Sequence, residues 1–137
     1  MRIPQSLVDE VVAHARDDLP NECCGMVGGA DGEARTVYRA ENAEGSPLRY
    51  SIGAAEQFRL MRAIEAAGEE LVGIYHSHTK SAAYPSQTDV NLAGWPDAVY
   101  LIVSLADPAA PDLKGFSIRD GEIAAAELVV DADLPGV

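Results

Sequence analysis

The sequence predicts an α/β fold in which helices flank a mixed β-sheet. Segments whose apolar residues recur at helical spacing alternate with short apolar runs that are typical of strands. Two Asp-Gly pairs, Asp31-Gly32 and Asp120-Gly121, lie between strand-like runs and predict tight hairpins. The run from Val99 to Leu105 is apolar throughout, as expected of a central strand that is covered on both faces.

The N-terminal third predicts a helix and then a hairpin. Apolar residues follow helical spacing from about Ser6 to Leu19, and Pro20 ends the pattern. His14 lies in this helix among charged residues, which predicts that it faces solvent. The hairpin strands and the loop after them are expected at residues 23–30, 34–40 and 41–47.

Cys23 and Cys24 are the two cysteines of the chain. Because neighbouring residues of a strand point to opposite faces, they are poorly placed to form a disulfide with each other, and free thiols are predicted. The apolar residues around them predict small buried hydrophobes. A cysteine-based zinc site of the nucleobase deaminase type requires His-x-Glu followed by Pro-Cys-x-x-Cys, a string that the sequence lacks.

A second helix is predicted over 54–67, with Gly68 as its C-terminal stop. Its apolar residues form a stripe that is expected to pack in the core, namely Phe58, Leu60, Met61 and Ile64. Trp95, beside Pro96, is expected to pack the turn before the 99–105 strand. The remaining predicted segments are a strand at 71–75, a loop at 80–85, a short helix from Ser86 to about Ala93, hairpin strands at 114–119 and 122–130, and a frayed tail at 131–137.

Length and charge narrow the class of protein. A chain of 137 residues predicts a single domain, placed at 1–130 and followed by the tail 131–137. No apolar run approaches bilayer length and the N-terminus lacks a signal-peptide stretch, so the cytoplasm is the expected location. The net charge of −12 disfavours nucleic acid and anionic membrane as partners, since both require basic patches.

His76-Ser77-His78, followed by Ser86 and Asp89, is the group of residues that indicates chemistry. Residues i and i+2 of a strand project to the same face, so the two imidazoles lie together. A catalytic zinc site keeps three protein ligands and a water, and the two histidines with Asp89 supply that number. Ser77 points to the other face and is expected to support the strand.

Ser86 and Asp89 also have a structural interpretation. Ser86-Gln87-Thr88-Asp89 fits the pattern of a helix capping box, which alone accounts for both residues. The histidine pair favours the metal site, because a buried imidazole without a partner or metal is costly. The two interpretations are compatible, since a helix start is a rigid place from which to aim a ligand.

This pattern, with the upstream element Glu22-Cys23-Cys24-Gly25, resembles the JAMM or MPN+ family of zinc metallopeptidases over most of the chain. Residues 74–79 and 83–86 are similar to the short actinobacterial members that release cysteine from a ubiquitin-like sulfur-carrier protein. Thr79 departs from the family, where proline is common, and Cys23 beside Cys24 is another departure. The resemblance implies a three-layer cytidine-deaminase-like fold.

The resemblance also implies roles for the site residues. His76, His78 and Asp89 would hold one Zn²⁺ with water as the fourth ligand, Glu22 would be the general base, and Ser86 would stabilise the oxyanion. Taken alone, Glu22 after Pro20-Asn21 is typical of a solvated loop.

The implied substrate is the C-terminal Gly-Gly tail of a sulfur carrier that bears cysteine in amide linkage. Two alternatives are a zinc amidohydrolase acting on a free small acyl-amino acid and a non-catalytic MPN scaffold. Iron, cobalt or manganese could replace zinc at such ligands. A homodimer is among the oligomeric states that the sequence allows.

Overall fold

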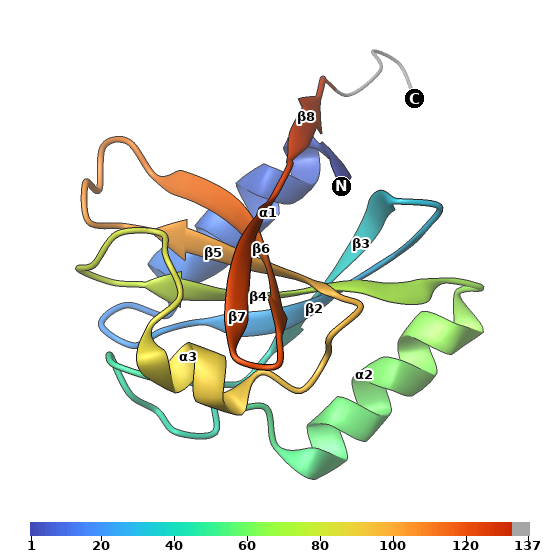
Figure 1. The fold of residues 1–137 in the computed structure, drawn as a ribbon, viewed down its shortest axis with the longest axis horizontal. Helices are drawn as coiled ribbons and strands as arrows, with labels where there is room; N and C mark the ends of the chain where they lie inside the picture. Colours follow the sequence, from blue (N-terminus) through green and yellow to red (C-terminus); the bar gives the residue numbers. More distant parts are fainter. Residues whose placement is uncertain (133–137) are drawn as a thin grey trace.

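The computed structural model describes residues 1–132, which form one eight-stranded sheet and three helices (Figure 1). The elements in chain order are β1 Arg2–Pro4, α1 Gln5–Asp17, β2 Cys24–Ala30, β3 Glu33–Ala40, α2 Ala54–Ala66, β4 Glu70–His78, α3 Gln87–Leu92, β5 Val99–Ser104, β6 Asp112–Arg119, β7 Glu122–Ala126 and β8 Val129–Asp131. Among these residues no helix is both long and apolar enough to cross a membrane.

The sheet is mixed, as predicted, with the strand order β7-β6-β5-β4-β2-β3-β1-β8. β4 and β5 run parallel, β1 runs parallel to both of its neighbours, and the remaining neighbours are antiparallel. Central β5 is buried along nearly its whole length, which confirms the interpretation of the apolar run from Val99. Only Glu127 and Leu128 separate β7 from β8, so the sheet curls until its two ends approach each other (Figure 1).

Helices cover both faces of this sheet and give three layers. α1 packs on one face, where Val11 and Ala15 meet Val27, Leu101 and other apolar residues. On the opposite face, α2 packs over β2 and β3, and α3 packs beside β4 and β5. The α/β class, the mixed sheet and the flanking helices predicted from the sequence are confirmed.

The two cysteines lie on opposite faces, as predicted. Cys23 belongs to the apolar cluster under α1 and Cys24 to the cluster under α2, and both are free and fully buried. Burial raises the pKa of each thiol to about 12, so neither is a thiolate at neutral pH.

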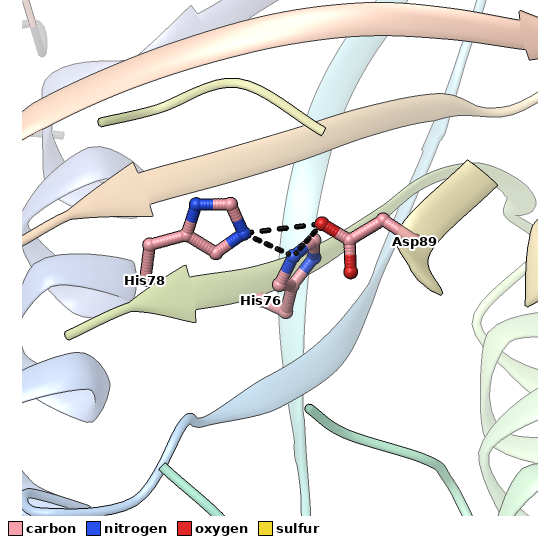
Figure 2. A group of neighbouring side chains, drawn as sticks. All are labelled: His76, His78 and Asp89. Carbon is pink, nitrogen blue, oxygen red and sulfur yellow. Dashed lines mark hydrogen bonds and ion pairs between the residues drawn. The ribbon is translucent and has the colours of Figure 1, made fainter. Parts of the chain in front are cut away.

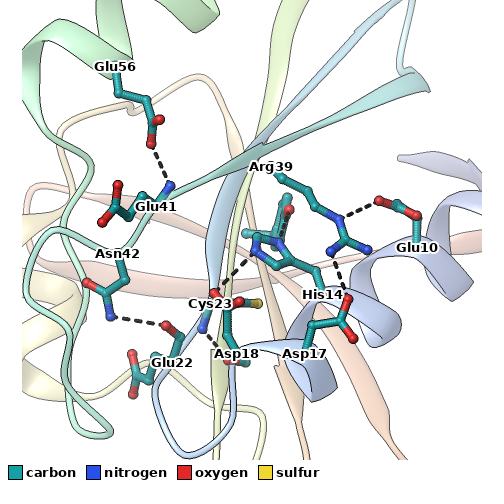
Figure 3. Close-up of polar contacts among 12 residues, drawn as sticks. Glu10, His14, Asp17, Asp18, Glu22, Cys23, Arg39, Glu41, Asn42 and Glu56 are labelled. Atoms are coloured by element: carbon teal, nitrogen blue, oxygen red, sulfur yellow. Dashed lines mark hydrogen bonds and ion pairs between the residues drawn. The ribbon is translucent and has the colours of Figure 1, made fainter.

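The prediction that His14 faces solvent is wrong. Its side chain is buried, because α1 lies within the curled sheet. Nε2 of His14 lies 3.3 Å from Oδ2 of Asp18, and Nδ1 lies 2.6 Å from the hydroxyl of Tyr75 (Figure 3 shows His14 with its neighbours). The Tyr75 ring lies directly across Gly25, where any Cβ would collide with it. Burial is the main cause that lowers the pKa of His14, while Asp18 opposes it.

The prediction that Phe58 packs in the core is also wrong, since its side chain is 64% exposed. Residues two apart on an α-helix point about 200° apart, so Phe58 and the buried Leu60 lie on nearly opposite sides of α2. Ile64 is buried and Met61 half-buried, as predicted. Phe58 instead stacks with the guanidinium of Arg62.

Trp95 packs in the turn before β5, as predicted, against the cluster of Ile74, Tyr100 and Ile118.

The predicted strand at 122–130 is two strands. β7 ends at Ala126, Leu128 packs into the cluster under α1, and β8 pairs with β1 at the far end of the sheet. An ion pair of 2.7 Å between Arg2 and Asp131 joins β1 to β8. Asp131 therefore belongs to a strand and not to a frayed tail. The short strand β1 was not predicted. Residues 133–137 of the predicted tail lie outside the described residues.

Candidate metal centre

Three predicted ligands converge at the C-terminal end of β4. His76 and His78 project from the same face of the strand, and Asp89 reaches them from the first turn of α3 (Figure 2). Nε2 of His76, Nε2 of His78 and Oδ2 of Asp89 form a triangle in which each side is 3.1 Å. All three side chains are buried, with 1%, 5% and 7% of their surface exposed.

This donor set fits a divalent ion. Three ligand atoms at zinc distances in tetrahedral geometry are about 3.3 Å apart, close to the sides of the observed triangle. Two imidazoles and one carboxylate are also a donor set that zinc accepts. His76, His78 and Asp89 could therefore hold a metal ion and leave one side of it open.

Second contacts orient the two imidazoles. Nδ1 of His78 donates to the carbonyl of Ala82 at 2.8 Å, which leaves its Nε2 lone pair toward the centre. The ring of His76 stacks on Tyr50, with centroids 4.4 Å apart, and its Nδ1 has no hydrogen-bond partner in the described chain. Burial lowers the pKa of His76, which favours the neutral imidazole that a metal requires.

Asp89 is held by a capping box. Oγ of Ser86 accepts from the amide of Asp89 at 3.1 Å, and Oδ2 of Asp89 accepts from the amide of Ser86 at 2.9 Å. Burial raises the pKa of Asp89, but the hydrogen bonds to His76 and His78 outweigh it, so the net direction is down. The capping box predicted for Ser86 and Asp89 is confirmed, and it is compatible with Asp89 as a metal ligand.

Glu22 lies beside this centre, in the segment between α1 and β2. Its side chain is 4% exposed, so it is not the solvated loop residue that its position alone would suggest. Asn42 donates to its carbonyl at 3.0 Å (Figure 3). The backbone carbonyl of Ser46 accepts from the Glu22 amide at 2.9 Å. Oε1 has no hydrogen-bond partner, and burial is the first cause that raises the pKa of Glu22 to about 7.

Glu22, His78 and Ser86 line one groove of about 470 Å³. The loop before Glu22, the loop before α2 and the segment after His78 form its walls, and most of the exposed wall surface is apolar. Leu48 is 83% exposed at its rim. The structure thus brings together all five residues that the sequence singled out, from β4, from α3 and its N-cap, and from the segment before β2.

Sequence reasoning missed two residues of this region. Asn42 organises the loop after β3, since its side chain also donates to the carbonyl of Arg49 and accepts from the amides of Glu44 and Ser51. An asparagine just after a predicted strand was the available signal. Tyr50, which stacks on His76, carries no local signal, because only the path of this loop brings it to the centre.

Known proteins resemble this chain over most of its length. The family model described as prokaryotic homologs of the JAB domain matches residues 4–119. The CysO-cysteine peptidase of Mycobacterium tuberculosis is 46% identical over 123 residues, which cover 88% of this chain and 84% of that protein. The desampylase of Haloferax volcanii is 42% identical over 104 residues, covering 70% and 74%.

A solved structure agrees with these sequence matches. The solution structure of a protein from Desulfitobacterium hafniense superposes with a TM-score of 0.89 at 35% identity, covering 98% of this chain and 96% of that one. With the family match, the three convergent ligands and the related peptidases, the chain belongs to the JAMM/MPN+ family, among the prokaryotic homologues of the JAB domain, and is a peptidase.

Proposed function

We propose that this protein is a zinc-dependent peptidase that cleaves after the C-terminal Gly-Gly of a ubiquitin-like sulfur-carrier protein and releases cysteine. One observation carries the proposal. The buried carboxylate of Glu22, with one oxygen free of any partner, opens into the same groove as His78, a member of the His-His-Asp centre. A general base and a metal site in one groove are what hydrolysis of an amide requires.

Zinc held by His76, His78 and Asp89 would lower the pKa of its bound water to around 7 and polarise the scissile carbonyl. Glu22 would take a proton from the attacking water on Oε1 and return it to the nitrogen of the leaving amine. Its pKa of about 7 suits both steps, because the carboxyl can accept and release a proton near neutral pH.

Ser86 would stabilise the oxyanion. As the cap of α3, its oxygen accepts the amide hydrogen of Asp89, so its own hydroxyl hydrogen remains available to donate. Ser86 is exposed and lines the groove beside Glu22 and His78. A donor of this kind is typically worth on the order of a hundredfold or more in rate.

The substrate class rests on the relatives. The mycobacterial relative is named for a CysO-cysteine substrate, and the haloarchaeal relative is named a desampylase. For this chain we infer an extended Gly-Gly tail, because glycine lets the backbone approach the metal closely. Such a reaction supplies cysteine in the cytoplasm.

The experiment compares three substrates with purified zinc-loaded protein. We expect release of cysteine from the carrier–cysteine adduct that is abolished by a chelator and restored by zinc. We expect no cleavage of an ordinary dipeptide or of ubiquitin chains.

A free acyl-cysteine serves as a fourth substrate for the alternatives. Equal turnover of this compound and the adduct would favour the small-molecule amidohydrolase. Turnover of no amide by fully loaded protein would favour the non-catalytic scaffold.

A further inference from the structure

A second cavity of about 210 Å³ lies between α2 and α3. Tyr50, Gln57, Ile74, Leu92 and Trp95 are among the residues that line it, and it shares none with the groove of Glu22. Binding sites for drug-sized ligands occupy about 300–1,000 Å³, so this cavity suits one side chain rather than a cofactor.

The lining of this cavity is uncharged, in a protein whose net charge is −12. Its polar side chains are those of Tyr50, Ser51, Gln57 and Tyr100, set among apolar residues. Within residues 1–132, the side chains of Tyr50, Ser51 and Gln57 make no hydrogen bond. These groups can serve a peptide backbone, and a charged side chain would find no group of opposite charge in this lining.

The cavity, the metal centre and the groove follow one another along β4. Ile74 lines the cavity, His76 and His78 belong to the centre, and Lys80 just beyond the strand lines the groove. Alternate residues of a strand share a face and are roughly 6.6 Å apart. A peptide laid extended over the centre therefore reaches the cavity at one end and the groove at the other.

Glu22 sets the direction of that peptide. A base that returns its proton to the leaving nitrogen must lie on the leaving-group side, and Glu22 lines the groove. The acyl side of the substrate must then run toward Ile74 and the cavity. Two residues of extended chain span the step from His76 to Ile74, so the third residue before the scissile bond reaches the cavity.

We infer that the cavity between α2 and α3 is a specificity site that takes an uncharged, apolar side chain of the third residue before the scissile bond. The inference rests on the proposed peptidase function. Gln57 and Tyr50 would hold the tail backbone that leads from the metal centre into it.

Trp95 permits a direct test, because it is the single tryptophan of the chain and lines the cavity. The probe is acetyl-Leu-Gly-Gly-Cys, added to zinc-loaded Glu22→Gln protein so that binding is seen without turnover. We expect a saturable change in tryptophan emission. Acetyl-Gly-Cys, which is too short to reach the cavity, should leave the emission unchanged.

Kinetics of the zinc-loaded wild-type protein provide the second readout. Replacing leucine of the probe by glycine or aspartate should lower kcat/KM by about tenfold or more. This factor corresponds to the free energy gained by burying a leucine side chain. Ser51→Phe should fill the cavity and abolish this preference, yet leave the zinc content per chain unchanged. Gln57→Ala should weaken binding of the long probe, whereas Gln5→Ala in the first turn of α1 should not.

Two outcomes would overturn the inference, namely equal kcat/KM for leucine, glycine and aspartate probes, or a probe that binds without any change in Trp95 emission. If the wild-type protein cleaves neither the probes nor the carrier–cysteine adduct, the proposed function fails instead. The emission titration then still decides whether the cavity binds the apolar residue.

Discussion

The two faces of β4 differ in how their polar groups are satisfied. On the face toward α1, the Tyr75 hydroxyl pairs with His14, and Oγ of Ser77 accepts from the amide of Cys23 at 2.8 Å. Residues 1–132 contain two buried side-chain atoms without a hydrogen-bond partner, Oε1 of Glu22 and Nδ1 of His76. Both lie on the opposite face. One strand thus carries a closed structural network on one side and an open chemical site on the other.

This difference separates polar groups that stabilise the fold from polar groups that serve function. A folded protein pairs nearly all its buried polar groups, since each unpaired group costs about 1–3 kcal/mol. Unpaired atoms gathered at one place therefore mark a site built for a ligand or a reaction. Variants on either face should separate the two roles.

The largest contrast is expected between two buried histidines. His76→Gln should abolish zinc binding and reduce peptidase activity to background, because it removes one of three ligands. His14→Gln should keep zinc but lower the free energy of unfolding by about 1–3 kcal/mol, because it breaks the Tyr75 contact. Zinc content per chain and urea unfolding provide the measurements. Full zinc occupancy in His76→Gln would contradict the ligand assignment.

A smaller loss is expected for Glu22→Gln. Removing a general base costs roughly 10²–10⁴ in kcat, and no zinc ligand is lost. Stability should stay the same or rise, because a buried carboxylate with one unpaired oxygen becomes neutral. The matched control is Glu44→Gln in the exposed loop after β3, which should change neither quantity. A near-normal rate for Glu22→Gln would show that the assigned base is wrong.

Two serines should sharpen the comparison further. Ser86→Ala should lower kcat by about a hundredfold and cost roughly 0.5–2 kcal/mol through the lost helix cap. Ser77→Ala should leave kcat nearly unchanged but cost about 1–3 kcal/mol, since the buried amide of Cys23 loses its acceptor. Steady-state kinetics beside thermal unfolding of both variants measure the split. Similar kcat values for the two variants would remove the oxyanion role.

The smallest effect is a dependence of stability on pH through His14. Its pKa is lower in the folded protein than in the unfolded chain, so below about pH 6.5 the unfolded chain binds more protons. His14 should therefore reduce the free energy of unfolding as the pH falls from 7 to 5. The difference between wild type and His14→Gln in metal-free urea unfolding isolates this contribution. A difference that does not vary with pH would contradict the burial of a neutral imidazole.

Local sequence patterns predicted most of the scaffold. The turn pairs Asp31-Gly32 and Asp120-Gly121 adopt positive φ, as hairpins of this kind require. The two helices predicted from apolar spacing agree closely in range with α1 and α2. Errors occurred where long-range packing decides. His14 is buried because the sheet curls around α1, and Leu128 leaves the line of β7 because the core under α1 accommodates it.

The sequence by itself determined that His76 and His78 share one face, that Ser86 and Asp89 start a helix, and that the cysteines cannot pair, because these follow from periodicities of two or three residues. Only the tertiary structure decided that Glu22, more than fifty residues away, shares a groove with His78, and that Tyr50 stacks on His76. These long-range contacts depend on the order of the strands in the sheet and on the path of the loops. Packing of the whole core decides both, and no local sequence pattern encodes them.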